Sequence, residues 1–271
     1  TVADATAASL NAALKNAAAD GSDALTLTVN GATATAADLN ALDGKTSVDV
    51  TVDAVAVTGD FADLNKVYVT NKANFANLGT EDVKITDAKV TAVQANTIAK
   101  ATEGKVIAEV EGSAAALNAA LKNTNDSDEI SITLTGTTAT AKDLKELATK
   151  TLKDVDASGI ETITGNAADV KAALAITSLV PGTVAVTVTG AVTVSDIAAI
   201  KLLAATGVIK ATLEGSATEL ATLANSSTDL LTSLRLSLNS IANLRFSFKS
   251  SLSSSRILRC SLAILLNSSL V

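Results

Sequence analysis

The side chains best suited to chemistry are the acidic residues of two loops at matching places in the sequence. Asp20 and Asp23 lie in the loop AAADGSD, and Asp126, Asp128 and Glu129 lie in the loop NTNDSDEI. Calcium takes oxygen ligands from loops of this kind, so these five residues are candidate calcium ligands. Neither loop has the spacing of an EF-hand or of a glycine-rich nonapeptide. A solvated acidic loop without a metal is therefore the competing interpretation.

The sequence gives little support for a catalytic site. The chain has no His and a single Cys, Cys260, which excludes a Ser-His or Cys-His pair. Carboxylate pairs do occur, for example Asp60 and Asp63, but a spacing of three residues is that of a helix cap and not of an acid–base pair. We predict no enzymatic activity and no cofactor, apart from the calcium considered above.

Threonine pairs of the form TxT suggest a third chemistry. They occur at Thr26/Thr28, Thr33/Thr35, Thr133/Thr135, Thr138/Thr140 and Thr187/Thr189. A flat array of threonines can order water, as in ice-binding solenoids. Charged residues such as Asp49 and Lys84 interrupt the array at other units, and Thr is an ordinary choice for the solvated side of a strand. Ice binding is therefore a remote alternative.

These residues belong to a recurring element, shown most clearly by residues 26–42, TLTVNGATATAADLNAL. The alternation of Leu25, Leu27 and Val29 with threonines predicts a strand, and Asn30-Gly31 predicts a turn. Thr35 precedes Asp38 by three residues, which is the capping-box pattern with Asp in place of Glu and predicts the start of a short helix.

The element returns about every 26 residues, and a longer repeat of about 105 residues contains four of them. Residues 114–123 match residues 7–16 with one change, and Gly165, Asn166 and Asp169 match Gly59, Asp60 and Asp63. Super-repeats therefore start near residues 1, 106 and 208, and the array extends over residues 1–229.

The predicted fold class is an α/β repeat solenoid, right-handed, with one strand and one short helix in each unit. Stacked units bury apolar faces that a single unit leaves exposed, with a parallel sheet on one side and the helices on the other. Positive φ angles are expected at the glycines that follow strands: Gly31, Gly59, Gly136, Gly165 and Gly190.

The amino-acid composition further limits the class of protein and its partners. Hydrophobic residues make up 48% of the 271 residues but aromatic residues only 2%, which suits thin, regular layers of small aliphatic side chains. A net charge of −7 argues against a nucleic-acid partner. No run of 18 apolar residues is present, so we expect no transmembrane span. The first residue is Thr and no signal peptide is visible, which suggests a processed or excised piece.

Residues 230–271 have a different composition. They contain no Gly, Asp or Glu but all four Arg of the chain, and they carry a net charge of +5 against −12 for residues 1–229. This tail could be an atypical end cap, a basic segment with the apolar anchor ILRCSLAILL, or sequence read out of frame. The composition changes all at once in mid-repeat, which favours the last interpretation slightly.

Two phrases resemble a known family: TAADLNALDGKTSVDVTVDAVAVTG at residues 35–59 and IETITGNAADVKAAL at residues 160–174. They are similar to the tandem repeats of very large secreted proteins of marine cyanobacteria and related bacteria, whose motifs are close to DLNALDGKT and ITGTAADV. The resemblance covers about residues 1–225 and carries no known active site. It implies an extracellular or cell-surface protein that forms layers, filaments, adhesins or motility-related coats.

Two functions follow as expectations. The first is a structural protein of the cell exterior, whose partner is a second copy of itself and which assembles into a filament, sheath or surface layer. The second is an adhesin or other binding module that uses the exposed sheet face or the acidic loops for a glycan or calcium.

Overall fold

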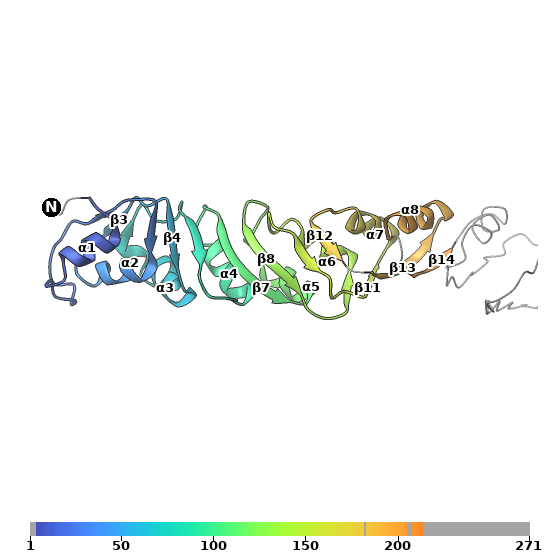
Figure 1. Cartoon of the computed structure of the whole chain (residues 1–271), viewed down its shortest axis with the longest axis horizontal. Coiled ribbons are helices and arrows are strands. Elements are labelled where there is room, and N and C mark those ends of the chain that lie inside the picture. Colours follow the sequence, from blue (N-terminus) through green and yellow to red (C-terminus); the bar gives the residue numbers. More distant parts are fainter. Residues whose placement is uncertain (1–3, 182, 205–207, 214–271) are drawn as a thin grey trace, which may run out of the picture.

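A computed structural model describes residues 4–181, 183–204 and 208–213 of the chain. Its helices and strands alternate, and they follow one another in sequence order along the length of an elongated molecule (Figure 1). The predicted α/β class is therefore confirmed. No helix within the described residues is both long enough and apolar enough to span a membrane.

Most units contain two strands where the sequence predicted one, and the unit between α4 and α5 has the single strand β7. After helix α1 (Ala7–Ala13), the first unit holds β1 (Thr28–Val29), β2 (Thr33–Thr35) and α2 (Ala36–Asp43). Strand β2 consists of the three residues TAT, and a strand this short leaves almost no periodic signal in the sequence.

The later elements repeat this order with some variation. They are β3 (Val50–Val52), β4 (Ala56–Gly59), α3 (Phe61–Asn65), the π-helix η1 (Lys66–Thr70), the 3-10 helix η2 (Lys72–Asn74), β5 (Phe75–Ala76), β6 (Asp82–Ile85), α4 (Ala92–Ala99), β7 (Val106–Gly112), α5 (Ala114–Ala120), β8 (Glu129–Leu134), β9 (Thr138–Thr140), α6 (Ala141–Leu147), β10 (Val155–Ala157), β11 (Thr162–Gly165), α7 (Ala167–Leu174), β12 (Leu179–Pro181), β13 (Ala185–Val192), α8 (Val194–Ala204) and β14 (Ile209–Leu213).

The strands form three sheets in the described part of the chain, and not the single sheet predicted. The N-terminal sheet has the order β1-β3-β5, the central sheet β12-β10-β8-β7-β6-β4-β2, and the C-terminal sheet β14-β13-β11-β9. All strand pairs within them are parallel. Thr28 pairs with Thr51 and Thr138 with Thr162, so successive units stack one above the next.

The central sheet joins the super-repeats that start near residues 1 and 106, here called the first and second super-repeats. By sequence, β8, β10 and β12 correspond to β1, β3 and β5. In the first super-repeat, β1, β3 and β5 form a separate sheet. In the second super-repeat, β8, β10 and β12 continue the sheet of β2, β4 and β6. Strand β7 makes the connection, because it pairs with β6 on one edge and with β8 on the other.

One apolar core runs through the units. Helices contribute leucines at spacings of three residues, such as Leu39 and Leu42 of α2, both fully buried. Strands contribute alternate residues, such as Ile130 and Ile132 of β8. Helices of seven or eight residues are marginal in isolation, so this packing is what keeps them folded.

The glycine predictions are partly confirmed. Positive φ is found at three of the five positions: Gly31, Gly136 and Gly190. The prediction was wrong for Gly59 and Gly165, which need no positive φ. They are needed for close packing, because a Cβ atom at Gly59 would lie 2.8 Å from the Cβ atom of Ala36, and one at Gly165 would lie 3.0 Å from that of Ala141.

Two predictions lie outside the described residues. These are the continuation of the third super-repeat after Leu213 and the atypical tail at residues 230–271, which includes Cys260.

Candidate functional site: polar contacts between successive units

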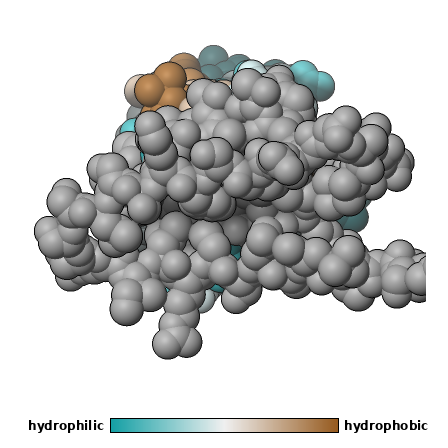
Figure 2. All heavy atoms as spheres, turned by 90° about the vertical axis from the view of Figure 1, so that its right-hand side faces the viewer, coloured by the Kyte–Doolittle hydropathy of each residue, from teal (hydrophilic) through white to brown (hydrophobic). Residues whose placement is uncertain are grey.

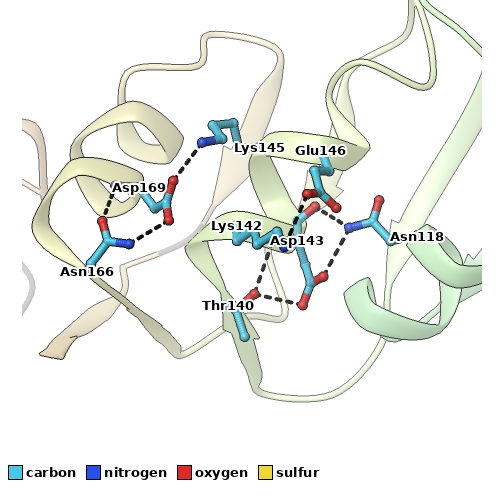
Figure 3. A network of polar contacts seen from close by, with 8 residues as sticks. All are labelled: Asn118, Thr140, Lys142, Asp143, Lys145, Glu146, Asn166 and Asp169. Carbon is cyan, nitrogen blue, oxygen red and sulfur yellow. Dashed lines mark hydrogen bonds and ion pairs between the residues drawn. The ribbon is translucent and has the colours of Figure 1, made fainter.

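The helix starts carry the predicted caps. In α6, the Thr140 hydroxyl accepts a hydrogen bond from the Asp143 amide (3.0 Å) and donates one to Asp143 Oδ2 (2.7 Å; Figure 3). Thr35 and Asp38 make the same contacts at the start of α2. Such a cap contributes about 1 kcal/mol to the stability of a helix.

The carboxylates at these starts also reach the preceding helix. Asn118 Nδ2 of α5 donates to Asp143 Oδ1 (3.1 Å) and to the Asp143 carbonyl (2.9 Å), and Lys145 Nζ of α6 donates to Asp169 Oδ1 (2.6 Å; Figure 3). We call each such contact a helix clasp. The other clasps are Asn11 to Asp38, Asn40 to Asp63 and Lys171 to Asp196.

The clasps differ in charge. The hydrogen bonds from Lys145 and Lys171 are the largest cause of the lowered pKa of Asp169 and of Asp196, respectively. The asparagine clasps are neutral donors. Their unused oxygens, Oδ1 of Asn11, Asn40 and Asn118, are buried and have no partner within the described residues. The clasps were not predicted, although the recurrence of Asn or Lys about one unit before each capping Asp was a usable signal.

Three of the candidate calcium ligands lie on exposed loops. The Asp20 carboxylate accepts hydrogen bonds from the hydroxyl (2.6 Å) and the amide (3.0 Å) of Ser22, which lower its pKa. Asp23 and Asp126 are both exposed. The backbone carbonyl of Asp23, and not its carboxylate, accepts a hydrogen bond from the Ser47 amide (2.8 Å).

The other two candidates have protein partners. Asp128 is only 2% exposed, and its carboxylate accepts hydrogen bonds from the amides of Val106 (2.7 Å) and Asn125 (2.9 Å). Glu129 lies between Lys105 (2.8 Å) and Lys153 (3.3 Å), whose hydrogen bonds lower its pKa. Across the described ranges, no three His, Cys, Asp or Glu residues are placed to hold a metal ion together. Calcium binding at these loops stays a prediction.

A buried polar pair lies in the segment between α3 and β6. The Tyr68 hydroxyl donates to Glu81 Oε2 (3.2 Å), which also accepts a hydrogen bond from the Gly79 amide (2.8 Å). Tyr68 is 1% exposed and Glu81 4%. Burial, with the Glu81 carboxylate as the second cause, raises the pKa of Tyr68. No sequence motif predicted the Tyr68–Glu81 pair.

The C-terminal sheet aligns threonines in two short columns. The first joins Thr138 to Thr162, and the second joins Thr140 to Thr164 and Thr187. Ala185 ends the first column and Lys210 ends the second. The hydroxyl of Thr140 is already engaged in its helix cap. The columns therefore contain only two and three threonines in this sheet, which is a small area for an ice-binding surface.

A groove of about 410 Å³ lies on the sheet where the super-repeats join. It is lined by charged and polar side chains that include Lys84, Asp87, Glu109, Ser131 and Lys153. Its position over β6, β7 and β8 places it on the exposed face of the central sheet.

Comparison with protein-family models, with curated proteins and with solved structures finds no match to this chain.

Proposed function

We propose that the protein is an extracellular structural protein, an α/β solenoid whose copies stack into a filament, sheath or surface layer. The central sheet is the observation that carries this proposal. Seven parallel strands from two super-repeats pair in one continuous order, so one super-repeat already adds onto another by strand pairing inside a single chain.

The physical reason is that stacking has no natural stopping point. Each unit covers the apolar face of its neighbour, and the helix clasps join neighbouring helices. An end of the array therefore offers strand edges to a further unit. A head-to-tail contact that does not close into a ring produces an open polymer.

The location and the partner follow from the same proposal. The partner is a second copy of the chain, and the resemblance of residues 35–59 and 160–174 to repeats of secreted bacterial proteins supports a place at the cell exterior. The composition suits this use, because a core of small aliphatic residues repeats without special chemistry in any layer.

Electron microscopy of the purified full chain, in calcium and in chelator, tests the proposal. We expect ordered filaments or sheets in both conditions, because the contacts that join units are hydrogen bonds, ion pairs and apolar packing. Monomers in both conditions, confirmed by analytical ultracentrifugation, would refute self-assembly. Assembly in calcium alone would instead assign a role to the acidic loops.

The groove over β6, β7 and β8 favours a second candidate function, a binding module for a glycan. Its mixed lining of Lys84, Glu109 and Ser131 provides donors and acceptors of the kind that sugar hydroxyls require. A glycan array with the Lys84→Ala variant as control tests this function. A chain that stays monomeric and loses glycan binding in that variant would favour the module over the filament.

A further inference from the structure

The junction between the two super-repeats shows how one super-repeat receives the next. Residues 107–112 of β7 pair in parallel register with residues 129–134 of β8. The Asp128 carboxylate, one residue before β8, accepts a hydrogen bond from the amide of Val106 at the start of β7. This hydrogen bond joins the start of β7 to the residue that precedes β8.

Strand β14 repeats the geometry of β7. Ile209 pairs with Val186 in the register in which Val106 pairs with Val83. The burial pattern is also the same, since Ile209, Ala211 and Leu213 are buried, as are residues 106, 108 and 110 of β7. Within the described residues, the outer edge of β14 thus resembles the edge that β7 presents to β8.

The matching receiver at the other end of the molecule is residues 23–29, which repeat residues 128–134. The backbone of Leu25 bonds to Thr46 and the carbonyl of Leu27 accepts from the Thr51 amide, both in the following unit. The amide and carbonyl of Thr26 between them therefore point the opposite way. Among the residues that the structure describes, no strand pairs with residues 24–27 and no partner for the Asp23 carboxylate is found.

We propose that β14 of one copy pairs with residues 23–29 of a second copy, in the register of β7 on β8. Leu213 takes the position of Val110, so that Thr212 lies opposite Thr26. The carboxylate of Asp23 then accepts a hydrogen bond from the Ile209 amide, as Asp128 does from Val106. The inference rests on the proposed function and names the interface of the polymer.

The remaining contacts of the two ends are compatible with this pairing. Ala5 already pairs with Val29 and occupies the position of Gly112, so it stays in place beside an incoming β14.

Helix α8 lies at the same end and exposes two leucines. Leu202 is 84% exposed and Leu203 40%. Figure 2 shows apolar atoms on the upper side of this end, the side on which Figure 1 places α8. At the junction of the two super-repeats α5 packs against α4, and α1 repeats the sequence of α5. In the proposed interface, α1 of the second copy therefore packs against α8.

Disulfide trapping in the full chain tests the register, with Cys260→Ser as background in every variant. Thr212→Cys and Thr26→Cys are prepared separately and mixed under mild oxidation, since neighbouring parallel strands bring Cα atoms within disulfide range. We expect a covalent dimer from the mixture and none from either variant alone. A mixture of Thr212→Cys with Ala24→Cys, two residues out of register, should give at least tenfold less dimer.

The carboxylate is tested by Asp23→Ala, with Asp20→Ala in the same loop as the matched control. Among the described residues the Asp20 carboxylate bonds only to Ser22 in its own turn, so its variant should assemble like the parent chain. Asp23→Ala should raise the critical concentration for assembly about tenfold and leave the thermal midpoint unchanged.

Two results would overturn the interface. Filaments without a mixed disulfide dimer would leave the proposed function standing and refute this pairing, whereas absence of both filaments and dimers would refute both. Equal critical concentrations for Asp23→Ala and Asp20→Ala would also contradict the assigned role of Asp23.

Discussion

The two super-repeats contain nearly the same residues, yet they use their first strand differently. Residues 129–134 form the six-residue strand β8, whereas of the matching residues 24–29 only Thr28 and Val29 are in a strand. The alternation of apolar residues is the same in both. Strand β7 supplies a partner for β8, so the neighbouring strand decides whether this sequence forms a ladder.

The same neighbour decides what a carboxylate does. Asp128 is buried and accepts a hydrogen bond from the amide of Val106, whereas the matching Asp23 is exposed.

The super-repeats also differ after their third helix, since the segment from Leu64 to Val83 is three residues longer than the matching segment from Val170 to Val186. The extra length is taken up by the π-helix η1 and the buried Tyr68–Glu81 pair.

The largest expected effect comes from breaking the junction itself. A Cβ atom at Gly104, just before β7, would lie 2.1 Å from the carbonyl oxygen of Glu81. Because the obstacle is backbone, Gly104→Ala should cost about 3 kcal/mol or more in the free energy of unfolding. Urea denaturation followed by circular dichroism measures this cost. Gly159→Ala, whose Cβ atom meets nothing closer than 3.7 Å, is the control and should be nearly neutral.

The second effect compares the matching aspartates. Asp128→Ala leaves the amides of Val106 and Asn125 without their acceptor, which should cost about 2–3 kcal/mol of unfolding free energy. Asp23→Ala removes an exposed carboxylate and should change stability by less than about 0.5 kcal/mol. Thermal or urea unfolding of both variants at low protein concentration provides the measurement. Equal losses would show that burial by β7 is not what separates the two residues.

A smaller effect is expected for the pair found only in the first super-repeat. Tyr68→Phe removes one hydrogen bond to Glu81 and should cost about 1 kcal/mol. The raised pKa of Tyr68 means that the folded state keeps its proton above the ordinary pKa of 10.0. Its contribution to stability is therefore complete below pH 10 and is lost as the pH rises further.

Absorbance at 295 nm reports this ionisation directly, because Tyr68 is the single tyrosine of the chain. We expect no tyrosinate signal until the protein unfolds at high pH, and less loss of stability above pH 10 in Tyr68→Phe than in the parent chain. A reversible titration near pH 10 in the folded protein would contradict the buried pair.

The sequence was sufficient for the features that repeat. The caps at Thr35 and Thr140, the apolar faces of the helices and the alternation of strands with helices all follow from local pattern. It was insufficient where a neighbour decides the outcome. Nothing in SDEI differs enough from SDAL to predict that Asp128 is buried and Asp23 is not, and the clasp of Asn118 with Asp143 depends on how two helices stack.

The smallest effect concerns the clasps, which are neutral at Asn11 and Asn40 but charged at Lys145. Lys145→Asn replaces the charged clasp between α6 and α7 by a neutral one, the type that Asn118 makes between α5 and α6. The hydrogen bond from Lys145 is the main cause of the lowered pKa of Asp169, so this pKa should rise toward its ordinary value of 3.8 in the variant. A lowered pKa contributes stability above the ordinary value, and this contribution is lost as the pH falls through the folded pKa.

The variant should therefore be slightly less stable than the parent chain at neutral pH, and the difference should disappear under acid. An NMR titration of the Asp169 carboxyl together with urea unfolding at pH 7 and pH 3 measures both. The control is Lys122→Asn, which removes an exposed charge that makes no ion pair within the described residues. If both variants shift the pKa of Asp169 equally, the general charge of the surface sets this pKa, and a clasp between stacked helices does not.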